Sequence, residues 1–449
     1  TPIVRRIREE FISGTRGGDL QQFRLFHEAA TRDGAVLTAR RTQTAPRQPV
    51  AFEFVDPRTI RLAAGALPEP GSIYELRYQA TNPRVLGIGF AATRDIVSYL
   101  RYAAGGRDLL GRRPTHALAF GISQAGRYLR DHLAQGFNRD ESGVRVFDGV
   151  FTHVAGIGRV FCNTEFGQPA RTRTWHEDHD FPEIEYPFAT AALLRDEETK
   201  VIETNTSTEY WQKGASLLHA DDMRDLALPT NVRGYYLSGT QHGGKAGMPR
   251  DAGPCTNPRN WHDPMPAIRA LLVALDEWVA NGREPPPSRL PRIADGTLVR
   301  AEAVTWPKLA ALRPPRASND VVELVDWTDP QPPTRAWQAL VPQVDADGNE
   351  TAGIRLPDIA VPRGTFTGWN LYRSPWPEGE LADREGTYLP FAATRAAREQ
   401  SGDPRPSLEE RYPTPQAYAG LVAEVVTALR RDRLLLDEDA AEYLRRASQ

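Results

Sequence analysis

The chain of 449 residues has few cysteines, no long apolar run and almost no net charge. Its formal charge of -3 does not supply the basic excess that binding to nucleic-acid phosphates requires. No stretch approaches the roughly 18 apolar residues that a membrane-spanning helix needs. The most apolar segment, residues 268–279, is interrupted by Arg269, Asp276 and Glu277 and so fits an amphipathic helix. We expect no membrane span and no nucleic-acid partner.

The two cysteines, Cys162 and Cys255, are too few for a disulfide framework or for a zinc site of their own. Two alternatives stay open for them. They form one bridge if the protein is exported, or they are two buried free thiols. The sequence leaves the compartment open and only slightly favours export over the cytoplasm.

The order of strand-like and helical segments predicts three parts. Residues 1–72 hold short β-like runs between Gly, Pro and Asp residues, with little sign of a core of their own. Residues 73–289 alternate strand and helix patterns, which predicts an α/β core with a mostly parallel sheet and helices on both faces. Within this core, residues 157–198 form a Pro- and aromatic-rich, lid-like excursion. Residues 290–449 are mixed and are expected to pack on the core as an extension.

The elements expected in the core are short. Apolar alternation and the positions of Gly and Pro set their limits. Strands are expected at 73–80, 115–120, 146–154, 200–204 and 232–237, and helices at 91–102, 127–135, 265–280 and, as a pair, within 412–447.

The main chemical signal is the segment Gly121-Ile-Ser123-Gln-Ala-Gly126, which lies between an apolar strand and a helical stretch. In a nucleophile elbow a serine occupies such a sharp turn, and small flanking residues let the backbone pass closely. Ala125 stands where the common G-x-S-x-G pattern has Gly, although Ala is still small. The plainer alternative is a serine that only caps the helix. We predict Ser123 as the nucleophile and the N–H of Gln124 as an oxyanion donor.

A serine hydroxyl needs a base to accept its proton. His242 follows the expected strand at 232–237 and lies in a glycine-rich loop with Gly239, Gly243 and Gly244. It also comes after the serine, in the order serine, acid, histidine that this kind of site uses along the chain. The alternative is a histidine with a purely structural role. We predict His242 as the base.

The strand at 232–237 leads to the histidine. The acid should follow the strand that comes before that one along the chain. Glu209 lies after the expected strand at 200–204 and is our first choice. It would hold the imidazole in the correct tautomer. Asp221, Asp222 and Asp225, in the next loop, remain as rivals.

Other residues are weaker candidates. His153 and Trp369 are expected to line a substrate pocket, although a packed polar residue is an equal alternative for His153. The run His176-Glu-Asp-His179 is better explained as a solvated loop than as a metal site. The turn at 345–349 lacks the sharp-turn glycine and the closing glutamate of a calcium loop. We expect no metal and no organic cofactor.

These motifs resemble those of a family of bacterial "alpha/beta hydrolase domain" proteins. The similarity covers nearly the whole chain and includes the elbow, the histidine loop and the segments Tyr74-Glu-Leu-Arg-Tyr78, Thr208-Glu-Tyr-Trp211 and Thr367-Gly-Trp-Asn370. The resemblance implies an α/β-hydrolase fold and carboxylic-ester chemistry without a defined substrate. A more distant similarity to glucuronoyl esterases favours a glutamate as the acid.

Members of that family usually carry a further N-terminal region with the first sheet strands and an oxyanion-side loop. Residues 1–72 contain no such loop, and the sequence starts at Thr1 and not at Met. We therefore expect a missing upstream segment to supply the N-terminal strands, so that the protein's own N-terminal fragment is a partner as a second chain.

Together these residues predict a serine hydrolase that cleaves a small-molecule carboxylic ester through a triad and an acyl-enzyme. Ser123 would attack, His242 would act as general base, and Glu209 would orient it. An amidase or lactonase with the same triad is one alternative. A non-catalytic binding protein on a hydrolase scaffold is the other.

Overall fold

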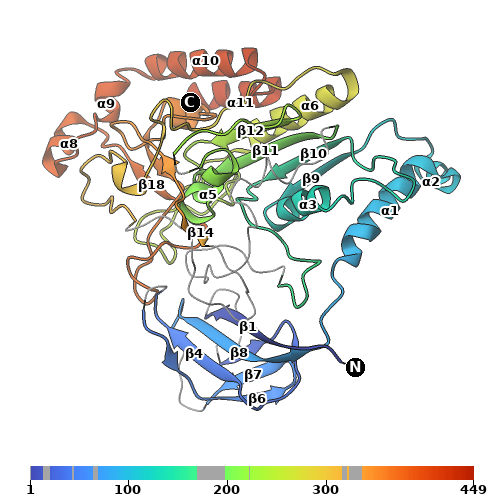
Figure 1. Cartoon of the computed structure of the whole chain (residues 1–449). Coiled ribbons are helices and arrows are strands. Elements are labelled where there is room, and N and C mark those ends of the chain that lie inside the picture. The colour runs from blue at the N-terminus through green and yellow to red at the C-terminus, as the bar shows by residue number, and fades with distance from the viewer. Residues whose placement is uncertain are drawn as a thin grey trace.

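A computed structural model of the chain shows an N-terminal β unit at one end and an α/β core with its C-terminal extension at the other (Figure 1). The structure describes residues 2–13, 21–42, 45–63, 69–168, 198–221, 223–315, 321–322 and 336–449.

The core is built on a four-stranded parallel sheet in the order β12-β11-β10-β9. Its strands are β9 (Leu118–Ile122), β10 (Gly149–His153), β11 (Lys200–Thr206) and β12 (Val232–Leu237). His153, the last residue of β10, lies beside Ile122, the last residue of β9, and beside Thr204, two residues before the end of β11, so the strands end at the same edge of the sheet. The loops that follow them therefore meet at one edge, and the parallel sheet predicted for the core is confirmed.

Helices cover both faces of this sheet. Val150 and Val201 pack with Leu129 of α3, whereas the neighbouring Phe151 and Ile202 pack with α6. Successive strand residues point to opposite faces, so α3 and α6 lie on opposite sides, as predicted. The core helices are α1 (Ile88–Tyr102), α2 (Ala104–Leu110), α3 (Gln124–Ala134), α5 (Ser207–Gln212), η1 (Ala215–Leu218) and α6 (Met265–Asn281).

The two outer strands of the sheet differ. Beyond β12, single bridges join Tyr235 to Arg289 and Leu237 to Ile354. Along β9, in contrast, no strand among the described residues pairs with the outer edge. Phe120 of β9 is 41% exposed. Within the part of the chain that the structure describes, the strand that leads into Ser123 is therefore an edge strand.

The N-terminal unit has a core of its own, contrary to expectation. A five-stranded and a three-stranded antiparallel sheet share one apolar cluster, to which Ile7 and Leu76 belong on one side and Phe23 and Ile60 on the other. The buried residues of this cluster come from several strands that are separated in sequence, so no single segment looks like a core. The strands are β1 (Val4–Ile12), β2 (Gln22–Arg24), β3 (Glu28–Ala29), β4 (Val36–Arg40), β5 (Gln48–Pro49), β6 (Phe52–Asp56), β7 (Thr59–Leu62) and β8 (Ile73–Thr81).

The expected domain boundary at residue 73 is wrong. β8 pairs antiparallel with β1 along its full length and with β4. It is thus a central strand of the N-terminal unit, and the chain enters the core only after Asn82. Alternation in residues 73–80 predicted a strand correctly, but alternation does not say which sheet a strand joins.

The excursion after β10 begins on the N-terminal unit. Phe161 and Phe166 insert into the apolar cluster of that unit. The side-chain amide of Gln168 donates to the carbonyl of Arg8 at 2.7 Å. Residues 169–197 lie outside the described residues, so the lid-like role of 157–198 stays a prediction.

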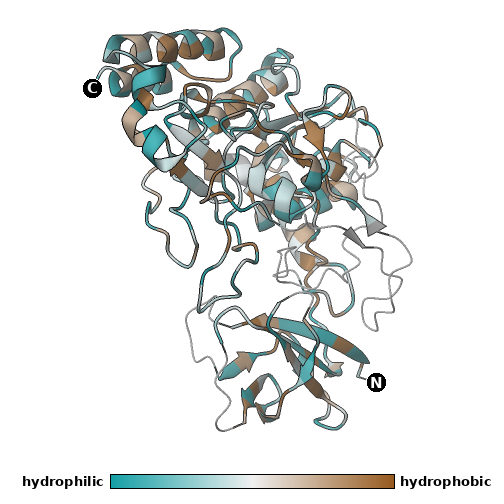
Figure 2. Cartoon of the chain, turned by 90° about the vertical axis from the view of Figure 1, so that its left-hand side faces the viewer, coloured by the Kyte–Doolittle hydropathy of each residue, from teal (hydrophilic) through white to brown (hydrophobic). Residues whose placement is uncertain are grey.

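The C-terminal extension packs on the core and adds antiparallel pairs, so "mostly parallel" holds for the core alone. Val422 of α10 and Tyr443 of α11 share a cluster with Leu271 of α6. Both predicted terminal helices are present, and in Figure 2 hydrophobic and hydrophilic residues alternate along them. In the parts of the chain that the structure describes, no helix has the length and apolar character needed to cross a membrane.

The elements of the extension are β13 (Leu298–Val299), η2 (Ala301–Ala303), β14 (Val321–Val322), β15 (Ala336–Trp337), β16 (Val341–Pro342), α7 (Pro357–Ala360), β17 (Gly364–Thr367), β18 (Thr387–Pro390), α8 (Arg395–Ser401), α9 (Leu408–Arg411), α10 (Pro415–Arg431) and α11 (Asp437–Ala447).

Candidate active site

Ser123 occupies the turn between β9 and α3 in a strained conformation, with φ 56° and ψ −115°. Its N–H donates to the carbonyl of His153 at 2.8 Å, and its own carbonyl accepts from the N–H of Arg127 at 3.0 Å. Few non-glycine residues adopt such angles unless the surrounding structure holds them. The turn has the form expected of a nucleophile elbow.

Small residues make this turn possible. A Cβ atom on Gly121 would lie 2.6 Å from the backbone of Ala125. On Gly126 it would lie 3.1 Å from the carbonyl oxygen of Gly121 and 3.2 Å from Ala155. The close approaches therefore fall on residues 121 and 126, which explains why alanine is accepted at position 125.

The structure brings three predicted residues into one hydrogen-bonded chain. His242 Nε2 lies 3.0 Å from Ser123 Oγ, and His242 Nδ1 lies 2.5 Å from Glu209 Oε1. Ser123 follows β9, Glu209 lies in α5 after β11, and His242 lies in the loop after β12. Because the parallel strands end together, these loops meet above one edge of the sheet.

Glu209 is held as a buried anion. It is the third residue of α5, and its Oε2 accepts hydrogen bonds from the backbone N–H and the hydroxyl of Thr206. Burial opposes its charge, but the adjacent His242 ring and the ammonium of Lys213 outweigh burial and lower the pKa of Glu209 to about 2. An ionised carboxylate can only accept, so Nδ1 of His242 carries its proton toward Glu209.

His242 is arranged as a neutral base. Burial and the positive charge of Lys213 lower its pKa below the ordinary value of 6.5, although Glu209 acts in the opposite direction. With Nδ1 protonated, Nε2 is free to accept the proton of the Ser123 hydroxyl. This protonation state is the one that general-base chemistry on a serine needs at neutral pH.

The rival acids lie in other networks. Asp221 accepts from the backbone N–H groups of Met223 and Arg224. Asp225 accepts from the N–H groups of Ile293 and Ala294. Asp222 lies outside the described residues.

A family model described as an alpha/beta hydrolase domain matches residues 16–445. The chain belongs to this alpha/beta hydrolase domain family. The resemblance inferred from the sequence motifs is thereby confirmed, and the membership supports hydrolase activity. No curated protein and no solved structure matches the chain significantly. The similarity to glucuronoyl esterases stays a prediction.

In this alpha/beta hydrolase, Gln124 is the first residue of α3, directly after Ser123. Backbone N–H groups at the start of a helix point along its axis and carry the positive end of the helix dipole. That location is the one expected of an oxyanion donor, and the role stays a prediction.

His153 and Trp369 are packed inside the protein, which corrects their expected place on a pocket wall. His153 is 2% exposed, and its Nδ1 lies 2.8 Å from the hydroxyl of Thr204. Trp369 is 1% exposed and packs against Trp211 of α5 and against Trp306 of the extension. His153 contacts the site through its backbone carbonyl, which accepts a hydrogen bond from the N–H of Ser123.

The weaker expectations have separate outcomes. Cys162 and Cys255 are free thiols, so no bridge joins them. The turn at 345–349 is closed by Asp345, whose carboxylate accepts from the N–H groups of Asp347 and Asn349. Among the described residues no group of three or more His, Cys, Asp or Glu side chains could hold a metal, and residues 176–179 lie outside that part.

Support for the histidine loop comes from residues that the sequence analysis missed. Asn260 donates to the carbonyls of Gly239 and Thr367 at 2.8 and 2.9 Å. Gln241, next to His242, accepts from the N–H of Gly386 at 2.7 Å. Partners so far apart in sequence leave no local pattern, so no motif could have found them.

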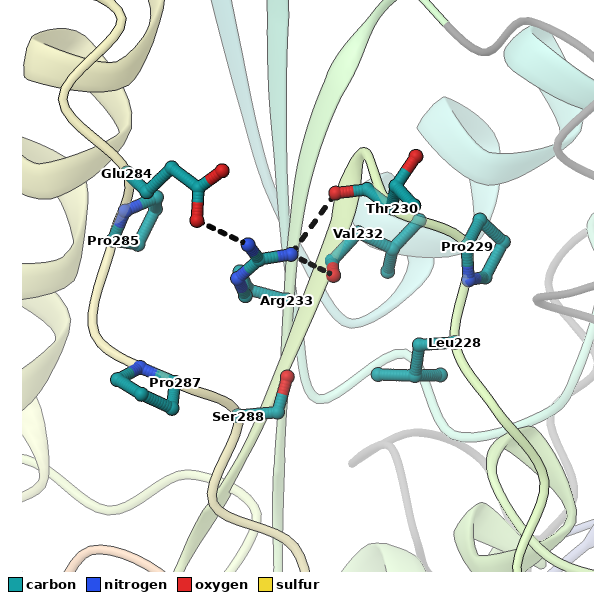
Figure 3. Close-up of a pocket in the computed structure, with 9 residues that line it drawn as sticks. All are labelled: Leu228, Pro229, Thr230, Val232, Arg233, Glu284, Pro285, Pro287 and Ser288. Carbon is teal, nitrogen blue, oxygen red and sulfur yellow. Dashed lines mark hydrogen bonds and ion pairs between the residues drawn. The ribbon is translucent and has the colours of Figure 1, made fainter.

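A hollow at the other end of β12 is separate from this site (Figure 3). Val232 and Arg233 begin β12, whereas His242 follows its far end. In the hollow Arg233 pairs with Glu284 at 2.9 Å and donates to the carbonyl of Thr230. The two regions lie at opposite ends of β12, whose six residues span roughly 20 Å.

Proposed function

We propose that this alpha/beta hydrolase is a serine esterase that cleaves a small-molecule carboxylic ester through an acyl-enzyme. The observation that carries the proposal is the unbroken chain from Ser123 Oγ through His242 to the buried carboxylate of Glu209, with distances of 3.0 and 2.5 Å. A serine in a strained turn, a neutral imidazole and an ionised carboxylate are the parts that acyl transfer needs.

In the acylation step, Ser123 Oγ forms a bond to the carbonyl carbon of the ester while His242 Nε2 takes the hydroxyl proton. The carbonyl electron pair moves to oxygen, where the N–H of Gln124 donates to the oxyanion. When the tetrahedral intermediate collapses, the bond between carbon and the alcohol oxygen breaks. The alcohol leaves with the proton from His242.

In the deacylation step, water attacks the acyl carbon and gives a proton to His242. The bond to Ser123 Oγ then breaks, and His242 returns the proton to the serine while the acid leaves. Glu209 stays ionised throughout, holds the ring in place and stabilises the imidazolium.

Hydrolysis of p-nitrophenyl esters, the matching anilides and simple lactones tests the proposal. We expect ester turnover that Ser123→Ala lowers by about 10⁴-fold or more. Faster cleavage of anilides or lactones, still dependent on Ser123, would assign an amidase or a lactonase instead. Turnover of none of these substrates, with tight binding of an ester analogue, would indicate a binding protein.

No strand among the described residues pairs with the outer edge of β9, which supports a second part of the proposal, a strand-bearing segment of the same protein as partner. The strand Leu118–Ile122 has no charged residue and no proline, the features that usually protect an exposed edge. A segment beside β9 would also lie next to Ser123, where a second oxyanion donor is needed. Native mass spectrometry of protein from its source tests this, and a bound or fused segment would support it. In an activity assay, full ester hydrolysis by residues 1–449 alone would contradict it.

A further inference from the structure

Glu350 connects the element that carries the acid to the loop that carries the base. It comes from the C-terminal extension and is 2% exposed. Its Oε1 accepts from the hydroxyl of Ser207 at 2.5 Å, and its Oε2 accepts from the N–H of Gly239 at 2.6 Å. Ser207 opens α5 two residues before Glu209, and Gly239 lies three residues before His242.

The same junction is closed by a second set of bonds. The hydroxyl of Ser207 also accepts from the N–H of Gly368 at 3.1 Å. The hydroxyl of Thr208 donates to the carbonyl of Gly368 at 2.6 Å and accepts from the N–H of His242 at 3.0 Å. The first turn of α5 is thus fixed to the histidine loop through the extension.

Joining two loops through a buried carboxylate carries a large desolvation cost. Burial raises the pKa of Glu350, although the hydroxyl of Ser207 and the N–H of Gly239 favour its ionised form. Two neutral groups could join these loops at less desolvation cost. A carboxylate, however, accepts two short hydrogen bonds at a fixed angle, which sets a distance with little freedom.

We propose that Glu350 is a positioning residue that fixes Glu209 relative to His242 by tying Ser207 to Gly239. The inference rests on the proposed esterase function. Glu350 acts through these two residues and does not contact the reacting atoms.

Glu350→Gln tests the inference because it keeps the shape and replaces one acceptor by a donor. Both the Ser207 hydroxyl and the Gly239 N–H donate to Glu350, and an amide has only one oxygen, so one of these two donors faces an amide N–H and loses its acceptor. We expect kcat on a p-nitrophenyl ester to fall about tenfold or more with KM little changed, because the error lies in orientation. Weaker contact with Glu209 also moves the acid limb of kcat/KM to lower pH, since Glu209 raises the pKa of His242.

Ser207→Ala removes the same bond from its other end. If Glu350 acts through Ser207, the double variant loses little more kcat than either single variant. Ser207→Ala also keeps the test decisive if Glu350→Gln does not fold.

Glu9→Gln is the matched control. Glu9, in the N-terminal unit, is 3% exposed and accepts from the N–H groups of Phe26 and His27 and the hydroxyl of Tyr78. This variant should unfold more easily yet keep kcat and the acid limb.

Wild-type kcat and an unmoved acid limb in both Glu350→Gln and Ser207→Ala would overturn the inference, as would additive losses in the double variant. Ser123→Ala is measured in parallel. If that variant keeps full activity, the proposed function itself fails, whereas an intact Ser123 dependence with an unaffected Glu350→Gln refutes only the role of Glu350.

Discussion

The two sides of the candidate active site are built differently. The nucleophile side is local: Gly121, Ser123 and Gly126 form one turn, and the carbonyl of His153 accepts from the Ser123 N–H beside it. The histidine side is assembled from distant parts, because Glu350 and Gly386 of the C-terminal extension, together with Asn260, hold the start of α5 and the loop after β12. The turn depends on six consecutive residues, so a substitution within them should disturb it strongly. On the histidine side several hydrogen bonds share the support, so the loss of one bond should have a smaller effect on activity.

The largest effect expected on the histidine side is that of Glu209→Gln. A glutamine amide has one oxygen acceptor and an NH2 donor, so Nδ1 of His242 loses an ionised acceptor and the ring populates the wrong tautomer. We expect kcat to fall by about 10⁴-fold on an ester substrate. Asp221→Asn, which removes a rival acid, should stay within about twofold of wild type. Equal losses in the two variants would contradict the choice of Glu209.

The largest effect expected on the nucleophile side, after the serine itself, is that of Gly121→Ala. The new Cβ would lie 2.6 Å from the backbone of Ala125, so the turn must shift and Ser123 Oγ moves away from His242. We expect kcat/KM to fall about 100-fold. Gly420→Ala is the control, because nothing lies within 4 Å of that position in α10. A fully active Gly121→Ala variant would show that the turn is less constrained than its geometry indicates.

The pH profile of kcat/KM tests the charge of the base on the histidine side, and the expected effect is smaller. His242 must be neutral to accept a proton, and its pKa lies below 6.5, so kcat/KM should be constant at neutral pH and fall only below that value. The ammonium of Lys213 lowers the pKa of His242, so Lys213→Met should move the acid limb to higher pH. A limb that stays in place in this variant would exclude Lys213 from setting the charge of the base.

The smallest effect expected is on stability and not on activity. His132 of α3 is fully buried among aromatic rings, and burial lowers its pKa to about 4. The unfolded chain therefore binds the extra proton first, and stability falls as the pH drops from 6.5 toward 4. The stability of His132→Phe relative to wild type should be greater in that window than at pH 8, as urea unfolding at both pH values can show. Equal acid sensitivity would contradict the assignment.

The three residues of the candidate triad could be predicted from the sequence. The turn at Gly121, Ser123 and Gly126 has a pattern of its own, and the order of serine, acid and histidine selected His242 and Glu209. The parallel sheet followed from the alternation of strands and helices, and its even ends bring the three loops together. These features depend on neighbours in sequence or on one simple rule of topology.

The rest depends on contacts between distant segments. Residues 73–81 alternate like a strand of either sheet, and only pairing with β1 and β4 assigns them to the N-terminal unit. Trp369 was expected at a pocket wall, but whether an aromatic residue faces a cavity or a core is decided by what packs on it. Glu350 directly follows the turn at 345–349, and its partners Ser207 and Gly239 lie more than a hundred residues away.

The most direct test of the account is peptide mapping after reaction with a fluorophosphonate probe. The probe phosphonylates a serine only where a base activates the hydroxyl. We predict one adduct, on Ser123, with labelling that slows sharply in His242→Gln and in Glu209→Gln. An adduct on another serine, or no adduct in a preparation that hydrolyses esters, would contradict the assignment of Ser123 as the nucleophile.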